Sequence, residues 1–315
     1  MIIVTGATGQ LGRQIVGRLL TRVPADQVGV SVRDPSKARA LADQGVRVRR
    51  GDFTDAASLA HAFEGASQVL IVSVDKMGGE CVKQHRAAID GAVAAGARRI
   101  LYTSQMGASA TSHFQACRDH AATEEALRAS GVPFTSLRDG FYATSAALLL
   151  GDAVLSGNSE GHIALPADGP VCWTAHADLA DAAAAILADE GRFDGPTPPL
   201  TAPRALTFDE IAEIATKLTG RTFTRTIVSD EEFRDGLTAG GVPVEVADQL
   251  LGIFTASRAG EFSTADPALA VLIGREPTPL SEVLRGLLLS SVSCLGARPG
   301  SVSRSTAAWR GRPRG

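Results

Sequence analysis

Gly6-Ala7-Thr8-Gly9-Gln10-Leu11-Gly12 directly follows the apolar run Ile2–Thr5 and opens a stretch with helical character. At such a strand–turn–helix junction the first glycine permits a sharp turn, and the second lets the backbone approach a pyrophosphate without an intervening Cβ. The third glycine allows the helix to pack closely on the strand, while the helix N-terminus offers unpaired amides to the phosphates. This stretch therefore predicts a dinucleotide-binding turn at the start of a parallel sheet.

The first 140 residues continue the pattern that this turn begins, because short β-branched runs alternate with helical stretches. Such alternation is typical of βαβ units. We therefore predict an α/β fold in which residues 1–150 form an NAD(P)-binding Rossmann domain, built on a doubly wound parallel sheet. The expected strands are Ile2–Thr5, Val28–Val32, Val46–Arg50, Gln68–Ser73, Arg99–Thr103 and Phe134–Arg138, and the expected helices are Gln10–Arg22, Ser36–Gln44, Ala56–Phe63, Glu80–Ala95 and Cys117–Ser130.

The second half of the chain has a different character. Residues 151–170 are rich in Gly, Asp and Pro, Asp178–Asp189 is typical of an Ala-rich helix, and helical patterns dominate from about residue 195. Thr207-Phe-Asp-Glu210 and Ser229-Asp-Glu-Glu232 have the spacing of capping boxes, in which a hydroxyl and a carboxylate satisfy free amides at a helix start. We expect residues 151–290 to form a smaller helix-rich lobe on the substrate side, interleaved with the Rossmann core.

Composition excludes several classes of function. The 315 residues carry a net charge of −3, which gives no electrostatic reason to expect nucleic acid or an anionic membrane as partner. No apolar run approaches the roughly 20 residues of a membrane span, and Met1 leads straight into a strand, so we expect a cytoplasmic protein. Cys81, Cys117, Cys172 and Cys294 are scattered without metal-ligand spacing, which indicates reduced, mostly buried thiols and no metal site.

The segment 293–315 differs from everything before it. It contains five Arg and no acidic residue, with Ser, Gly, Ala and Pro between them. Such a segment cannot bury enough apolar surface to offset the entropy lost on ordering. We predict a disordered basic tail without a function of its own; the alternative is that its arginines contact nucleic acid.

The end of the second expected strand indicates which cofactor is bound. An NAD site places an acid there to accept from the ribose 2′-hydroxyl, whereas this chain has Arg33 at the tip and Lys37 about one turn later. A planar guanidinium can bind a 2′-phosphate with two parallel hydrogen bonds. Asp34 follows Arg33 and is expected to cap the next helix. We therefore predict NADPH rather than NADH.

The next two strands end in polar residues that could contact the rest of the cofactor. Asp52 follows the third strand, where a carboxylate can accept from the adenine amino group while the backbone of Phe53 frames the base; the alternative is that Asp52 caps a helix. Ser73 ends the fourth strand, over which the ribose and nicotinamide usually lie in this kind of fold.

These residues also carry a resemblance to a known family. The chain is similar to the NmrA-like, atypical short-chain dehydrogenase/reductases, and within them it most resembles the bacterial type 2 NAD(P)H:quinone oxidoreductases. The resemblance covers residues 1 to about 290 and leaves the basic tail unmatched. The segments that carry it are Gly6–Gly12, Val32–Ala38, Gly51–Asp55, Tyr102–Ser104, Asp119–Glu124 and Leu137–Tyr142.

The resemblance implies a set of cofactor contacts. It places Arg33 at the 2′-phosphate and the segment from Asp139 to Thr144 along the nicotinamide, with Trp173 to Asp178 closing the cleft. Two departures from the family's pattern weaken the assignment of these contacts on the substrate side. The family usually has Asn where this chain has Asp139, and a polar residue where Val74 stands. The remaining expected contacts are Gly6, Ala7, Thr8, Gly9, Gln10 and Leu11 at the pyrophosphate, Ser73, Val74 and Asp75 at the ribose, and Thr103, Ser104, Gly140, Phe141 and Thr174 nearby.

An absent motif is equally informative. Ordinary short-chain dehydrogenases use Tyr-x-x-x-Lys, in which the phenol protonates an alkoxide and the lysine lowers the pKa of the phenol. Here Met106 stands four residues after Tyr102, and Ala146 four residues after Tyr142, the second of the chain's two tyrosines. Ser104 occupies the position of the usual serine, and His120 lies on the helix that would carry the Tyr/Lys pair. His120 is therefore either a structural histidine or part of the site.

Quinones fit a site without an obvious general acid. They accept hydride readily, and the hydroquinone anion is stabilised by aromaticity, so holding the reacting atoms about 3–3.5 Å apart meets the main requirement. We expect an NADPH-dependent oxidoreductase in which Asp139, Tyr142 and His120 shape the pocket of a quinone-like acceptor. Two alternatives stay open: a non-catalytic NADP(H)-sensing regulator, and a tailoring reductase for a polycyclic metabolite. A homodimer is also expected.

Overall fold

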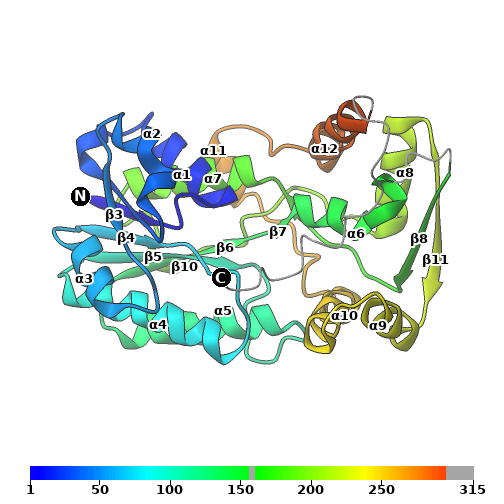
Figure 1. Ribbon diagram of the computed structural model, residues 1–315, viewed down its shortest axis with the longest axis horizontal. Coiled ribbons are helices and arrows are strands. Elements are labelled where there is room, and N and C mark those ends of the chain that lie inside the picture. The colour runs from blue at the N-terminus through cyan, green and yellow to red at the C-terminus, as the bar shows by residue number, and fades with distance from the viewer. Residues whose placement is uncertain (156–159, 296–315) are drawn as a thin grey trace.

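A parallel seven-stranded sheet forms the centre of the molecule (Figure 1). The computed structural model describes residues 1–155 and 160–295. The strands lie in the order β3–β2–β1–β4–β5–β6–β10, so the chain reverses direction across the sheet between β1 and β4. This is the doubly wound α/β order expected from the sequence, and ligands bind at such reversal points. The strands are β1 (Ile2–Thr5), β2 (Val28–Val32), β3 (Arg47–Arg50), β4 (Gln68–Ile71), β5 (Arg99–Gln105), β6 (Phe134–Asp139) and β10 (Gly195–Pro196).

Helices cover both faces of this sheet, which explains why its inner strands β1, β2 and β4 are buried along their whole length. One face packs against α1 (Gln10–Leu19), α7 (His176–Ala188) and α11 (Ala268–Ile273). The other face packs against α3 (Ala56–Phe63), α4 (Gly79–Ala94) and α5 (Gln115–Ala129), as Figure 1 shows.

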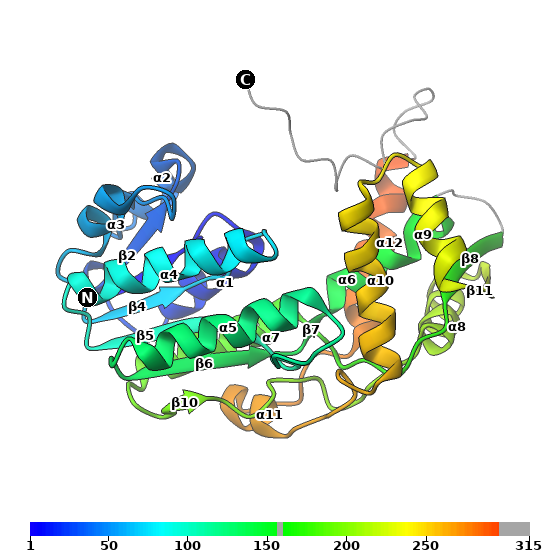
Figure 2. The same ribbon diagram turned by 90° about the horizontal axis from the view of Figure 1, so that it is seen from below.

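A second body with its own core lies beyond the carboxyl ends of the strands (Figure 2). Its centre is aromatic: Trp173 packs edge-on against Phe208, with ring centroids 5.6 Å apart, and Phe208 in turn contacts Phe254 at 5.8 Å. A short parallel pair, β7 (Phe141–Tyr142) with β9 (Trp173–Thr174), joins this body to the sheet. Its other elements are α6 (Ala143–Leu155), β8 (Glu160–Pro166), α8 (Phe208–Thr219), β11 (Thr222–Val228), α9 (Asp230–Ala239), α10 (Val244–Arg258) and α12 (Leu280–Leu295).

The two bodies are interleaved along the chain. The core under α1 includes residues of α7 and α11, which follow large parts of the lobe in sequence. Conversely, Ala143 and Ala146 of α6 are buried in the core of the lobe. The expected boundary at residue 150 therefore falls inside α6.

Most expected elements are found within a few residues of their predicted bounds, and both capping boxes are confirmed. The Thr207 and Ser229 hydroxyls accept from the third helical amides, and Glu210 and Glu232 reach back. The expected helix Ser36–Gln44 is instead a 3-10 turn, Pro35–Ala38, followed by the short α2 (Arg39–Ala42). Strands β8 and β11, which pair in parallel, lie where only loop and helix were expected.

The start of the expected tail is helical. Helix α12 runs to Leu295, so the first three residues of the expected tail belong to this helix; residues 296–315 lie outside the described part of the chain.

Cys81, Cys117 and Cys172 are free and buried, as expected, and burial raises the pKa of the Cys81 and Cys117 thiols to about 12. None of the described helices has the combination of length and apolarity that crossing a bilayer requires.

Candidate functional site

The glycine turn lies at the carboxyl end of β1, at the reversal point of the sheet. Gly6 adopts a φ of +61°, which a side chain would strain, and its amide donates to the Ser31 carbonyl at 3.2 Å. The Gly9 amide donates to the Gly6 carbonyl at 2.9 Å. A Cβ on Gly12 would lie only 2.4 Å from that same carbonyl oxygen, so helix α1 can press against the turn only because Gly12 has no side chain.

The first turn of α1 is open to a ligand. Gly9 is its N-cap residue, no side chain caps the helix, and no acidic residue stands in its first turn. Thr8, Gly9 and Gln10 are exposed. Free amides and the positive end of the helix dipole therefore face solvent, and this arrangement fits a pyrophosphate.

Arg33 and Lys37 stand at the tip of β2, free to bind an anion. Both are exposed, and neither side chain makes a hydrogen bond or ion pair with any residue in the described ranges. Asp34 does not compete for a ligand, because its carboxylate accepts from the Ser36 amide at 3.0 Å and the Ser36 hydroxyl at 2.6 Å. These bonds lower the pKa of Asp34. The capping role expected for Asp34 is thus confirmed.

Asp52 and Phe53 follow β3, next to the tip of β2. The Asp52 carboxylate accepts from the Thr54 amide at 2.9 Å and the Thr54 hydroxyl at 2.8 Å. The bond from the Thr54 amide is the main cause that lowers the pKa of Asp52, and the nearby charge of Arg33 adds to it. It is Asp55, not Asp52, that caps α3. Asp52 and Phe53 are partly exposed, and Asp52 is close enough to Arg33 to feel its charge.

The loop after β4 is held from below by side chains of neighbouring elements. The Ser73 amide donates to the Thr103 hydroxyl at 2.9 Å, and the Gly78 amide donates to the Asp119 carboxylate at 2.6 Å. Thr103 is buried, so its hydroxyl braces the loop and does not open into the cleft. Ser73 and Val74 are half-buried and Asp75 is exposed, so these three remain available to a ligand that lies along the loop.

Behind this loop lies a polar cluster that unites three elements: His85 of α4, Tyr102 of β5 and His120 of α5. The Val74 amide donates to His85 Nε2 at 3.1 Å, and Ser73 Oγ lies 3.3 Å from the same nitrogen. The Tyr102 hydroxyl lies 3.3 Å from His85 Nδ1 and 2.7 Å from His120 Nδ1. Burial lowers the pKa of His85 to about 4 and of His120 to about 3, so both rings are neutral at neutral pH.

Ser104 belongs to a second buried cluster. Its hydroxyl donates to Glu124 at 2.7 Å, and Arg138 binds the same carboxylate through Nε at 3.1 Å and Nη2 at 2.7 Å. Glu124 is buried, and this two-pronged bond compensates its charge. The Ser104 hydroxyl is therefore committed to Glu124, away from the position expected for a cofactor contact.

The segment after β6 forms the opposite wall. Asp139 is buried, and its carboxyl has no hydrogen-bond partner among the described residues. Burial raises the pKa of Asp139 well above its usual value, which favours the protonated carboxyl. The ring of Tyr142 packs against that of His176, with centroids 4.2 Å apart and the ring planes tilted by 38°.

Thr174 and Gly140 explain how this wall is held. A Cβ on Gly140 would lie 2.2 Å from the Thr174 hydroxyl, so only glycine fits there. The Thr174 hydroxyl in turn accepts from the Ala202 amide at 3.0 Å and is fully buried. Thr174 thus supports the wall without reaching the cleft, whereas Phe141 is partly exposed and packs edge-on against Trp173 at 5.2 Å.

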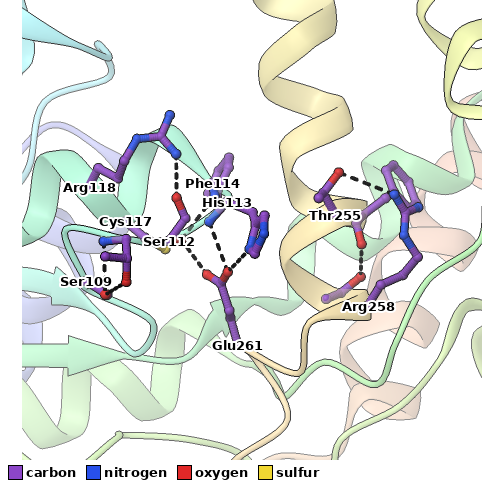
Figure 3. A network of polar contacts seen from close by, with 12 residues as sticks. Ser109, Ser112, His113, Phe114, Cys117, Arg118, Thr255, Arg258 and Glu261 are labelled. Atoms are coloured by element: carbon purple, nitrogen blue, oxygen red, sulfur yellow. Dashed lines mark hydrogen bonds and ion pairs between the residues drawn. The ribbon is translucent and has the colours of Figure 1, made fainter.

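Hydrogen bonds of Glu261 connect the lobe to the loop between β5 and α5 (Figure 3). Glu261, just after α10, accepts from the Ser112 hydroxyl and from the His113 amide at 3.0 Å, and it also pairs with His113 Nδ1 at 2.6 Å. Burial alone would raise the pKa of Glu261, but these hydrogen bonds outweigh burial and lower it. The loop between β5 and α5 is therefore fixed to the lobe.

Sequence reasoning missed His85 and Glu261, and it placed His176 at the cleft only as part of the segment Trp173 to Asp178. His85 shares the buried stripe of α4 with Cys81, Ala88 and Ile89, and a polar residue in such a stripe is a detectable signal. His176 and Glu261 act through contacts distant in sequence, and no local pattern marks them. Within the described ranges, no group of His, Cys, Asp and Glu is arranged to hold a metal ion.

Comparisons with known proteins agree with this geometry. The model of the NmrA-like family matches residues 1–283. Quinone oxidoreductase 2 of Escherichia coli is 35% identical over 282 residues, which cover 90% of this chain and 96% of that protein. The crystal structure of the E. coli NADPH-dependent quinone oxidoreductase in complex with NADPH superposes with a TM-score of 0.84 at 34% identity, over 91% of this chain and 99% of that one. The triphenylmethane reductase of Citrobacter sp. in complex with NADP(H) gives 0.81 at 36%, with the same coverage.

Proposed function

Since the chain belongs to the NmrA-like family, we propose that it is an NADPH-dependent reductase whose acceptor is a quinone or a similarly conjugated molecule. One observation carries the choice of cofactor: an uncapped glycine turn lies beside an arginine, Arg33, that has no partner among the described residues. The NADPH and NADP(H) complexes of the two solved relatives support it.

The cofactor half of the cleft would bind by backbone amides and a few cations. The amides at Gln10 and Leu11 would hold the pyrophosphate, since no side chain among the described residues caps the start of α1. Arg33 would bind the 2′-phosphate, with Lys37 adding charge. Asp52 and Phe53 would border the adenine, and the loop Ser73–Asp75 would border the ribose.

The acceptor half would be formed by the wall Asp139–Tyr142, His120 and the lobe of residues 151–290. When bound, the cofactor supplies hydride. The protein would then hold the acceptor ring near the nicotinamide and exclude water, which is the main contribution that a readily reduced acceptor needs. A protonated Asp139 can donate a hydrogen bond where the family usually has an amide, so its neutral form preserves that capacity.

The proposal is tested by steady-state oxidation of NADPH in the presence of quinones, triphenylmethane dyes, azo dyes and aldehydes. Turnover with quinones and not with aldehydes is expected. Equal affinity for NADPH and NADP+ without turnover of any acceptor would instead establish the alternative role of a redox-sensing regulator. Turnover restricted to polycyclic acceptors would indicate a tailoring reductase. The expected homodimer stays a prediction, which light scattering during gel filtration would test.

A further inference from the structure

We propose a proton relay behind the cofactor-binding loop that delivers a proton to the reduced acceptor. Its members are Ser73, His85, Tyr102 and His120. The relay rests on the proposed function, because it assigns the source of the proton that a quinone needs after it has taken hydride. It also assigns a role to Tyr102 and His85, whose side chains are buried and are not used in hydride transfer.

The relay is continuous in space. Ser73 Oγ lies 3.3 Å from His85 Nε2, His85 Nδ1 lies 3.3 Å from the Tyr102 hydroxyl, and that hydroxyl lies 2.7 Å from His120 Nδ1. The four residues come from the β4–α4 loop, α4, β5 and α5, so the sheet and both helices hold them in line. His85 and Tyr102 are fully buried, which excludes water from the middle of the path.

The backbone fixes the direction in which the relay points. The Val74 amide can only donate, and it donates to His85 Nε2, so the proton of the neutral His85 ring is on Nδ1. His85 Nδ1 can then donate to the Tyr102 oxygen at 3.3 Å, in competition with the Thr123 oxygen at 3.0 Å, and the Tyr102 hydroxyl is free to donate to His120 Nδ1. His120 therefore carries its own proton on Nε2.

Both ends of the relay are open. His120 Nε2 has no partner among the described residues and is not one of the atoms that are both buried and unpaired, so it is accessible. His120 is only partly buried, in contrast to His85 and Tyr102. At the other end Ser73 is half-buried in the loop that we assign to the ribose.

The transfer balances in protons and electrons. The acceptor gains an electron pair with the hydride and takes one proton from His120 Nε2, while His120 Nδ1 takes the Tyr102 proton. The Tyr102 oxygen takes the proton from His85 Nδ1, and His85 Nε2 takes the Ser73 hydroxyl proton, which water replaces. Both histidines stay neutral throughout. The Val74 amide then faces an N–H, which is unfavourable. The starting tautomers return when His120 Nε2 takes a proton from solvent and the chain runs in reverse, so that Ser73 releases a proton to water.

The surroundings favour transfer between neutral groups. Burial lowers the pKa of both histidines and raises the pKa of Tyr102 above its usual value, so no member carries a lasting charge at neutral pH. The nearby carboxylates are occupied: Asp119 accepts from Gly78 and Gln115, and Glu124 binds Arg138 and Ser104. The Cys81 thiol lies 3.7 Å from His85 Nδ1, off the path.

Thr123 offers a matched control. Its hydroxyl lies 3.0 Å from His85 Nδ1 but leads back to the Asp119 carbonyl, so it branches from the path without continuing it. Tyr102→Phe and Thr123→Val each remove one buried hydroxyl that contacts His85. Only the first interrupts the relay.

The experiment compares these two variants with a pair of quinones of similar size. Tetramethylbenzoquinone yields a basic hydroquinone anion that needs a proton, whereas tetrachlorobenzoquinone yields a weakly basic one. Tyr102→Phe should lower kcat with the tetramethyl compound by roughly ten- to a hundredfold, the range of modest general acid catalysis. It should leave kcat with the tetrachloro compound nearly unchanged. With the tetramethyl compound it should also abolish the solvent deuterium isotope effect on kcat. Thr123→Val should leave all three unchanged.

Equal losses with both quinones in Tyr102→Phe, or equal losses in the two variants, would overturn the relay. A second readout needs no turnover: ¹⁵N NMR of the imidazoles should show His85 protonated on Nδ1 and His120 on Nε2. The opposite tautomer at His120 would also overturn it. Failure of the wild type to reduce any quinone, with the tautomers as expected, would refute the proposed acceptor and leave the relay's geometry standing.

Discussion

The two walls of the cleft differ in how their polar groups are hydrogen-bonded. At the β1–β3 side, polar groups have no partner among the residues that the structure describes: the free amides at the start of α1, Arg33 and Lys37. At the β5–β6 side, polar groups are buried and bonded to one another: His85 with Tyr102, and Glu124 with Arg138 and Ser104. The first wall is complementary to an anionic ligand that brings its own hydrogen-bonding groups. In the second, most buried polar groups are bonded within the protein, and Asp139 and His120 Nε2 are left for the acceptor.

This difference indicates which changes each wall tolerates. Removing a group from the open wall removes a contact with the ligand and leaves the protein intact. Removing a group from the closed wall leaves a buried partner unsatisfied, which typically costs about 1–3 kcal/mol of stability before any effect on the reaction. The following predictions test whether binding and chemistry divide between the walls in this way.

Gly9→Val should have the largest effect. A Cβ at this position would lie 3.2 Å from the Gly6 carbonyl, which small shifts can relieve, but the branched side chain would occupy the approach of the pyrophosphate. We expect NADPH binding to be lost in calorimetry while the melting temperature changes little. Gly17→Val in α1 is the matched control, since a Cβ there meets nothing within 4 Å. Retained binding in Gly9→Val would place the nucleotide elsewhere.

Arg33→Ala should weaken NADPH by roughly ten- to a hundredfold, because a charge-assisted hydrogen bond contributes on the order of 1.5–3 kcal/mol. NADH, which lacks the 2′-phosphate, should bind the variant as it binds the wild type. Titration of both cofactors with both proteins measures the difference. Equal losses for the two cofactors, or a wild type that prefers NADH, would contradict the role of Arg33.

Tyr142→Phe should lower turnover of unsubstituted benzoquinone less than roughly tenfold, well below the 10²–10⁴ of an essential general acid. It should change KM more than kcat, because it alters the shape of the acceptor pocket. His120→Ala, which removes the last donor of the relay, should instead lose as much kcat as Tyr102→Phe does. Rates measured across pH would test this: a thousandfold loss in Tyr142→Phe, together with the disappearance of a pH-dependent limb near neutrality, would make Tyr142 an obligatory proton donor.

Asp139→Asn should have the smallest effect on activity, equal to or slightly above the wild type, since it restores the family's usual amide. Its stability is the sharper test. Because burial raises the pKa of Asp139, the folded wild type holds a proton that the unfolded chain releases, so its stability falls as pH rises above about 4. The variant cannot titrate there.

Melting temperatures between pH 4 and neutrality, compared with those of the exposed-site control Asp26→Asn, should therefore show Asp139→Asn gaining stability relative to the wild type as pH rises. A difference from the wild type that stays constant with pH would mean that the Asp139 carboxyl is ionised in the folded protein.

The open wall could be predicted from sequence and the closed wall only in part. The glycine turn, Arg33 and the cap at Asp34 depend on neighbours within a few residues, so their spacing was enough. The commitment of Ser104 to Glu124, and the packing of Tyr142 against His176, depend on which residues of distant elements meet. Strands β8 and β11 were missed for the same reason, because they pair across 62 positions of the chain.

The interleaving of the two bodies has a consequence for how such proteins can be re-engineered. Because α7 and α11 return to complete the core under α1, no single cut separates the cofactor body from the lobe. A fragment that ends near residue 142 would expose the sheet face that α7 covers, and a transplanted lobe would arrive without its connections. The cofactor body and the lobe therefore cannot be exchanged as whole units in this architecture. A new acceptor must be reached by point substitutions in the second wall, made one at a time within an intact frame.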